Sequence, residues 1–588
     1  MKKVKNFKHL FFLCFFLIFS GVVSAQNVIN IYGYALTCID STLFSVVDPA
    51  MPCTPGDAII TPLSGSKVGA TVSLNNNNYV VYYPAPNFVG HDTLQYAVLC
   101  NDITYSVNVY ISVVKCPDNI MEADCFDAPT VVNWDYKLLM SSPVTDAVCD
   151  HSLPLVGDID NDGKTEIIAP AIPQGGTSVL TNILYIFEVN GTTLTRQQKL
   201  DIPYINLINN SYSIANVDGG SYAALFIATT VSSNPSTDQG QLIKFVYDGT
   251  QYIEAWRRTY TTLNTRHSPQ PMIADFNNDG IPEILVYDKI FNARTGDLLV
   301  DAGYLTDVTK GFGFGGHAVS GHPTWTPVIP HAYSSIMVVA DIDGDGRPEV
   351  IGGNSVYKVQ INNPTGTAGN SFTLLRQAST LGRTDISDGA TSIADMDGDG
   401  LLDVVVTAPL TASTASLYIW NPRTGDILNT NVINNLPTSY SEPNGASVAF
   451  IGDIDGDGEP EICLVALNTM RAYDYNASTK QISQKWSRTV TDGSGATTIV
   501  MFDFNQDGQQ ELVYRDQANL RIINGVDGVN MPNGTFACIS STGNEYPVVA
   551  DINNDGAAEI IVTGRASGGS NRVMVFAAKT AKDKWANA

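Results

Sequence analysis

Short runs of apolar residues, separated by polar turns, recur along most of the chain and predict β-strands. Apolar residues alternate with polar ones over residues 94–100 and again over 105–113, on either side of an Asn-Asp turn. Farther along, β-branched runs such as 404–406 and 560–562 are continuous, which is typical of buried strands. Long stretches with the 3.6-residue period of an amphipathic helix do not occur. The pattern predicts an all-β protein.

One nine-residue acidic loop recurs seven times, each copy flanked by two such apolar runs. Its pattern is Asp-x-Asp/Asn-x-Asp-Gly-x-x-Glu/Asp, and an eighth, degenerate copy begins at Asn216. Counting all eight, successive copies start 48 to 66 residues apart, which suits one propeller blade of four short strands. The sequence therefore predicts an eight-bladed β-propeller, with seven blades as the alternative if the degenerate unit does not form one.

The two ends of the repeat region predict how the propeller closes. Only two clear strands follow the last acidic loop, whereas the segment Trp134–Met140 precedes the first loop and has no partner of its own. We expect this segment to supply the outer strand of the final blade, because closure removes the exposed edges of the ring.

The acidic loops have the chemistry of calcium sites. Side chains at positions 1, 3, 5 and 9, with the main-chain carbonyl at position 7, offer the hard oxygens that calcium prefers, and Gly at position 6 permits a sharp reversal. Position 12, the last ligand of an EF-hand, is Ala, Val, Gly, Leu or Tyr in the seven copies, so the EF-hand interpretation fails. The predicted ligands, with each position-7 residue acting through its carbonyl, are Asp158, Asp160, Asp162, Lys164 and Glu166; Asp275, Asn277, Asp279, Ile281 and Glu283; Asp341, Asp343, Asp345, Arg347 and Glu349; Asp395, Asp397, Asp399, Leu401 and Asp403; Asp453, Asp455, Asp457, Glu459 and Glu461; Asp503, Asn505, Asp507, Gln509 and Glu511; and Asp551, Asn553, Asp555, Ala557 and Glu559.

The net charge of −25 originates in these loops. Seven loops with four ligating side chains give 28 groups, of which three are amides, so 25 of the 58 acidic residues occupy these ligand positions and the other 33 match the 33 Lys and Arg. About seven bound Ca²⁺ ions, acting mainly as structural staples, would cancel 14 of these charges. An acidic chain without clustered Lys and Arg excludes nucleic acid as a partner.

The N-terminal part predicts export and disulfide bonds. Residues 1–25 have the basic, apolar and small-residue regions of a Sec-type signal peptide, and no apolar run is long enough for a membrane span. Eight cysteines remain after its removal, an even number that fits disulfides in an exported protein. Cys116 and Cys125 are candidates for a local bridge, and a zinc site is the weaker alternative because no Cys-x-x-Cys occurs.

Two resemblances follow from these motifs. The seven loops make residues 133–588 resemble FG-GAP/VCBS repeat propellers, which are related to the integrin α-subunit head. The resemblance implies calcium at the loop positions given above. It implies none in the unit at Asn216, where Gly220 and Ala224 replace two carboxylates. The Tyr-x-Pro-Ala-Pro-Asn-Phe-x-Gly-x-Asp run, which ends at Asp92, makes residues 27–115 similar to bacterial Ig-like or cadherin-like β-sandwich modules of surface proteins. Residues 116–132 read as a linker. Together the two resemblances imply a secreted surface protein of the Bacteroidetes type.

The resemblance leaves the activity open, because the family includes adhesins, surface-layer proteins and a few polysaccharide lyases. The leading hypothesis is a secreted or cell-surface scaffold for adhesion or ligand binding, with an extracellular protein or glycan as partner, and not an enzyme. The alternative is a secreted polysaccharide-degrading, lyase-like enzyme on the same propeller, in which His317 and His322, near Trp325 and His331, would form the pocket. No C-terminal sorting domain is visible, which leaves open that the chain is part of a larger surface protein.

Overall fold

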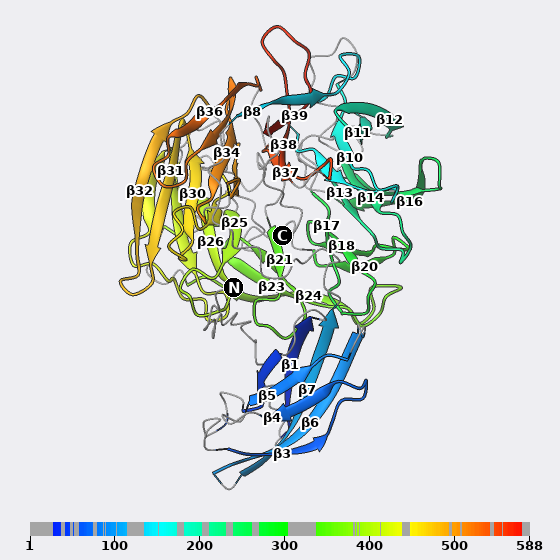
Figure 1. Cartoon of the computed structure of the whole chain (residues 1–588), viewed down its shortest axis with the longest axis vertical. Helices are drawn as coiled ribbons and strands as arrows, with labels where there is room; N and C mark the ends of the chain where they lie inside the picture. The colour runs from blue at the N-terminus through cyan, green and yellow to red at the C-terminus, as the bar shows by residue number, and fades with distance from the viewer. Residues whose placement is uncertain are drawn as a thin grey trace, which may run out of the picture. The chain divides into compact units, whose positions relative to one another are not determined.

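The described part of the chain consists of β-strands and turns. The computed structural model describes residues 28–36, 42–47, 51, 58–74, 79–85, 88, 90–101, 103–114, 135–150, 152–172, 182–202, 211–230, 239–261, 270–303, 337–379, 383, 385–386, 388–411, 413–437, 447–492, 497–505, 508–540, 546–554 and 557–578. These ranges contain no helix, and hence none that is long and apolar enough to cross a membrane. The chain divides into two compact units, which are described separately (Figure 1).

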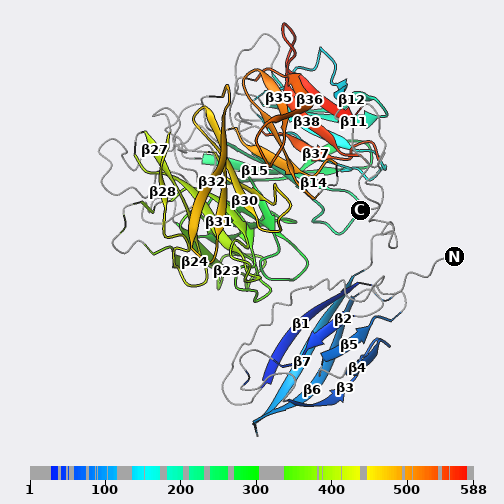
Figure 2. The same ribbon diagram turned by 60° about the vertical axis from the view of Figure 1, so that its left-hand side comes forward.

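The first unit contains two β-sheets around one apolar core (Figure 2). One sheet has the strand order β1-β7-β6-β3 and the other β2-β5-β4. The strands are β1 (Val28–Leu36), β2 (Thr42–Ser45), β3 (Ile59–Ser64), β4 (Thr71–Leu74), β5 (Tyr79–Tyr83), β6 (Gly90–Cys100) and β7 (Ile103–Val114). The predicted hairpin is confirmed: β6 and β7 are antiparallel and meet at Asn101, which has φ 46°. The parallel pairing of β1 with β7 had no signal in the sequence.

Alternation in the β6–β7 hairpin builds this core. Leu94, Tyr96 and Val98 on β6 are buried, as are Val107 and Val109 on β7, and their side chains pack in a single apolar cluster. Successive residues of a strand point to opposite faces, so every second residue can enter the core while its neighbours face outwards.

The second unit contains eight antiparallel sheets of four strands each within its described residues, as expected of propeller-like repeats. In chain order the first four sheets are β9 (Leu155–Gly157), β10 (Glu166–Pro170), β11 (Ile183–Asn190) and β12 (Thr193–Asp201); β13 (Tyr212–Ala215), β14 (Ala224–Thr230), β15 (Gln239–Tyr247) and β16 (Tyr252–Thr261); β17 (Met272–Ala274), β18 (Glu283–Val286), β19 (Lys289–Asn292) and β20 (Leu298–Asp301); and β21 (Met337–Ala340), β22 (Glu349–Gly352), β23 (Ser355–Gln360) and β24 (Ser371–Gln377). The next three are β25 (Ala390–Ala394), β26 (Asp403–Pro409), β27 (Thr414–Trp420) and β28 (Ile433–Pro437); β29 (Phe450–Gly452), β30 (Glu461–Ala466), β31 (Thr469–Asn476) and β32 (Gln481–Thr489); and β33 (Ile499–Phe502), β34 (Glu511–Arg515), β35 (Asn519–Ile523) and β36 (Asn530–Ala537). The degenerate unit thus forms a sheet, β13–β16, like the others.

The final sheet joins the two ends of this unit. It contains β37 (Val548–Ala550), β38 (Glu559–Gly564), β39 (Arg572–Ala578) and, as its outer strand, β8 (Tyr136–Ser141) from the start of the repeat region. The first strand of the last sheet, β37, also contacts β9 of the first sheet, and the Thr563 hydroxyl donates a 2.9 Å hydrogen bond to the Ser152 carbonyl. The prediction that Trp134–Met140 supplies the outer strand is therefore confirmed for its described residues, and Figure 1 shows β8 beside β39.

The cysteines correct one expectation. Cys149 and Cys463 are free thiols and both are buried, so the even cysteine count did not mean that every mature cysteine is paired. Cys463 lies in an apolar cluster and packs there as a small core residue. The candidate bridge between Cys116 and Cys125 lies outside the described residues, as do the signal peptide and the linker.

Candidate metal sites in the acidic loops

All seven acidic loops occupy the same place in their sheets. Each loop begins at the residue after the first strand, and its position 9 is the first residue of the second strand, for example Asp158 after β9 and Glu166 at the start of β10. The prediction that each loop lies between two strands is confirmed. The second strand is buried along its length in six of the sheets, namely β10, β18, β22, β30, β34 and β38. Because position 9 is the first residue of this strand, its carboxylate is buried as well.

The position-9 carboxylate is buried, and one of its oxygens is hydrogen-bonded to the backbone. It is at most 2% exposed in every loop. In all seven loops one of its oxygens accepts a hydrogen bond of 2.9–3.3 Å from the backbone N–H of position 2, as Glu166 Oε2 does from Ile159. The other oxygen is buried without a hydrogen-bond partner in Glu166 and Glu283. A buried anionic oxygen without a partner is costly, and a bound cation would satisfy it.

The glycine at position 6 makes the turn that the sequence predicts. Gly163, Gly280, Gly400 and Gly458 have φ between 81° and 89°, a conformation that residues with a Cβ rarely adopt. Their backbone N–H groups donate hydrogen bonds of 2.8–3.1 Å to Oδ2 of the position-1 aspartate. The turn therefore holds the position-1 carboxylate in a fixed orientation toward the loop.

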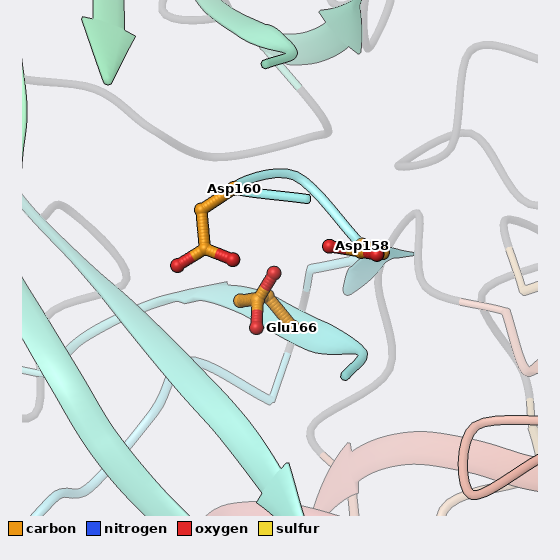
Figure 3. Close-up of side chains that lie close together, drawn as sticks. All are labelled: Asp158, Asp160 and Glu166. Atoms are coloured by element: carbon orange, nitrogen blue, oxygen red, sulfur yellow. The ribbon is translucent and has the colours of Figure 1, made fainter. Parts of the chain in front are cut away.

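Four loops bring three carboxylates together. In each of these groups, ligand atoms from three residues lie within 4.8 Å of one another. Figure 3 shows the group in the first loop, where the carboxylates of Asp158, Asp160 and Glu166 face a common space. The other groups are Asp341, Asp343 and Glu349; Asp395, Asp397 and Asp399; and Asp453, Asp455 and Glu461. These clusters fit a hard cation, which requires several oxygens at one point.

The other three loops have Asn at position 3 and form no such group among their described residues. In one of them the Asn277 amide donates a 3.1 Å hydrogen bond to Asp279. Asp507 and Asp555 lie outside the described residues. At position 7 the backbone N–H, for example that of Lys164, donates to the position-5 carboxylate at 2.8 Å. Coordination through the position-7 carbonyl stays a prediction.

Burial, together with neighbouring carboxylates, raises the pKa values of the position-9 carboxyl groups. Burial, followed by the neighbouring aspartates, raises the pKa of Glu166 and of Glu349 to about 8. Burial likewise raises the pKa of Glu283, Asp403 and Glu461 to about 7. Without a cation these groups resist ionisation near neutral pH, and a divalent ion would compensate the charge that the fold brings together.

A lysine takes part in the degenerate loop, a feature that the loop pattern alone did not predict. Lys244 on β15 is 2% exposed, and its Nζ lies 2.6 Å from Oδ1 of Asp218, at loop position 3. The ammonium also lies 5.8 Å from the centre of the Phe226 ring. Because Gly220 and Ala224 carry no carboxylate, the single ammonium neutralises the one acidic side chain left in this loop. The degenerate unit therefore has an ion pair where the other loops have several carboxylates.

Basic side chains also approach intact loops. Lys358 Nζ lies 2.7 Å from Asp345, and Lys485 contacts both Asp455 and Glu461. These partners come from strands outside the nine-residue loops, so the loop pattern could not reveal them. The predicted histidine pocket, including His317 and His322, lies outside the described residues.

The comparisons with known proteins support the repeat assignment. Three overlapping segments, residues 341–406, 395–464 and 453–514, match the FG-GAP-like repeat family. No curated protein sequence matches the chain. Similar solved structures include the Vibrio cholerae biofilm matrix protein Bap1, at 17% identity with a TM-score of 0.49, covering 77% of this chain and 92% of that one. The rhamnogalacturonan lyase YesW is 14% identical, with a TM-score of 0.32 and coverage of 92% and 90%. Saccharomyces cerevisiae Sqt1 is 12% identical, with a TM-score of 0.41 and coverage of 75% and 98%.

Proposed function

We propose that this protein is a secreted or cell-surface scaffold, a calcium-stiffened eight-bladed β-propeller that binds an extracellular protein or glycan. The observation that carries the proposal is the state of the position-9 carboxylate. In every loop the fold buries this group and gives one of its oxygens to the backbone. A bound cation would compensate the buried negative charge that this arrangement repeats in seven loops.

Calcium suits these loops better than other common cations. The donors are carboxylate and amide oxygens, with no sulfur and no imidazole in the pattern, which disfavours zinc and copper. Calcium accepts six to eight oxygens in flexible geometry, whereas magnesium demands a near-ideal octahedron. At an extracellular affinity of about 10⁻⁴ M and about 1 mM calcium, each ion would add roughly 1.4 kcal/mol of stability. Seven ions would add about 10 kcal/mol, comparable with the stability of a whole domain.

The eight sheets are the basis for the blade count. Each sheet carries one loop between its first and second strands, the degenerate loop included, and the last sheet is completed by β8. The N-terminal unit, with its two small sheets, is proposed to be the Ig-like module of a surface protein. The signal peptide and the millimolar calcium outside cells are consistent with export, since a cytosolic protein would meet far less calcium.

Binding arrays test the scaffold proposal. The full chain, lacking only its signal peptide, would be applied to arrays of glycans and matrix proteins in 2 mM calcium and again after chelation. We expect a defined glycan or protein to be retained in calcium and lost with the chelator, because the ions fix the loops that connect the strands. Turnover of a polysaccharide, abolished by His317→Ala, would instead establish the enzyme.

A further inference from the structure

The outer strands of the sheets share a one-residue irregularity. In six sheets the pairing of the third strand with the outer strand shifts by one residue, which leaves one outer-strand residue without a partner, a β-bulge. In four of these sheets the unpaired residue is apolar: Ala255, Leu299, Leu375 and Leu139. In the other two it is polar, Gln197 on β12 and Lys485 on β32.

Both polar bulge residues reach the acidic loop of their own sheet, and they reach the same loop position. Gln197 Nε2 donates a 2.8 Å hydrogen bond to Oδ2 of Asp160, at position 3 of the first loop. Lys485 Nζ donates to Oδ2 of Asp455, at position 3 of the loop Asp453–Glu461. A bulge bends its strand and redirects one side chain, so the shared register directs both side chains to one place.

The two contacts differ in charge. Gln197 brings a neutral amide, whereas Lys485 brings an ammonium that also lies 3.2 Å from Glu461 Oε1 and 3.0 Å from Asp474 Oδ1. Two of its three carboxylate partners, Asp455 and Glu461, are loop residues that the proposed calcium site requires. Lys485 is only 18% exposed, so its charge is poorly screened by water.

From this placement we propose that the bulge residue of the outer strand sets the calcium affinity of its loop, and that Lys485 is a built-in competitor that makes the loop Asp453–Glu461 bind calcium more weakly. The inference rests on the proposed function of the loops as calcium sites. Lys244 supplies the precedent within the chain, because its ammonium already serves an acidic loop that lacks two carboxylates.

Asp474 can keep the Lys485 ammonium paired after calcium binds to the loop. It lies outside the nine-residue loop, on β31, and its side chain is 42% exposed. When calcium takes over Asp455 and Glu461, the Lys485 ammonium keeps Asp474 as a partner and does not become an unpaired charge. The loop thus has two cation-satisfied states, one with lysine and one with calcium, and calcium concentration selects between them.

A reciprocal exchange of the two bulge residues tests the proposal. Calcium binding to the chelator-treated protein would be measured by isothermal titration calorimetry for the wild type, Lys485→Gln and Gln197→Lys. We expect Lys485→Gln to tighten one site about tenfold and Gln197→Lys to weaken one site about tenfold, because one charge a few ångströms from a divalent ion is added or removed. Lys480→Gln, which removes the same charge at an exposed position of the same hairpin, should bind like the wild type.

A second background assigns the effect to its loop. In Asp453→Asn protein, which loses a ligand of that site, the Lys485→Gln change should no longer alter the titration. If the wild type binds calcium but both exchanges leave every site unchanged, the bulge residue does not tune the loops and the inference is wrong, although the calcium proposal stands. If the wild type binds no calcium at all, the proposed function fails first and the inference falls with it.

Discussion

Glu166 offers a substitution whose effect on stability should change sign with calcium. Its side chain is fully buried; Oε2 accepts the Ile159 N–H at 2.9 Å, and Oε1 has no hydrogen-bond partner. In Glu166→Gln the amide oxygen can keep the bond to Ile159, while the amide nitrogen can donate to Asp158 or Asp160. The substitution therefore removes a buried charge from the calcium-free protein and a ligand from the calcium-bound protein.

The raised pKa of Glu166 sets the size of the expected change in stability. Burial raises the pKa of Glu166 from 4.5 to about 8. At about 1.36 kcal/mol per pKa unit, this shift destabilises the calcium-free fold relative to the unfolded chain by at most about 4 kcal/mol at pH 7.5. Water entering at the exposed tip of the loop lowers this cost, so we expect Glu166→Gln to stabilise the calcium-free protein by about 1–2 kcal/mol. With calcium, loss of the ion at this site should instead cost about 1.4 kcal/mol.

Thermal melts with and without calcium measure both effects. For a unit of this size, 1–2 kcal/mol corresponds to a shift of about 1–2 °C in melting temperature, upwards after chelation and downwards in 2 mM calcium. Glu254→Gln, the same charge change at an exposed side chain outside the acidic loops, is the control and should shift neither melt. A lower melting temperature of equal size under both conditions would refute the reasoning, because Glu166 would then be only a hydrogen-bond acceptor.

Three further substitutions or conditions test other parts of the account. The fold raises the pKa of the position-9 carboxyl groups, so it favours their protonated form. In a series of melts at different pH, the stability of calcium-stripped protein should be greatest below about pH 4.5 and should fall as the pH rises through 7 to 8. A rise in stability over that range would contradict the direction of the pKa shift. Lys244→Met should lower the melting temperature equally with and without calcium, whereas a loss confined to one condition would mean that the degenerate loop binds calcium. Gly458→Ala should destabilise the protein by about 1–2 kcal/mol, because Gly458 has a φ of 89°, which strains the backbone of any residue with a Cβ. An added Cβ would meet no atom within 4 Å, so no steric clash contributes. An unchanged midpoint of urea unfolding would argue against that turn.

The sequence predicted what depends on local patterns. Alternation in β6 and β7 placed the hairpin, and the repeated acidic loop placed the boundary between the first and second strands of seven sheets. Leftover segments at the two ends predicted the pairing of β8 with β39. These inferences succeeded because strand periodicity, turn residues and loop ligands each depend on residues that are close together in the amino-acid sequence.

What the sequence missed depends on contacts between distant residues. Lys244 is 26 residues from Asp218, and Lys485 is 30 residues from Asp455, so neither partner was visible in the loop pattern. The bulge that directs Lys485 is a property of the register between β31 and β32. The parallel pairing of β1 with β7 and the free thiol of Cys463 likewise follow from packing.

Counting the ions bound to chelator-stripped protein, together with its melting temperature, tests the central claim most directly. The protein would be dialysed against 1 mM calcium, its calcium measured by atomic emission, and its melt compared with that of the stripped sample. The account predicts about seven ions per chain and a melting temperature raised by about 10 °C, since seven sites add about 10 kcal/mol. Binding of no calcium, or identical melts in calcium and chelator, would contradict it.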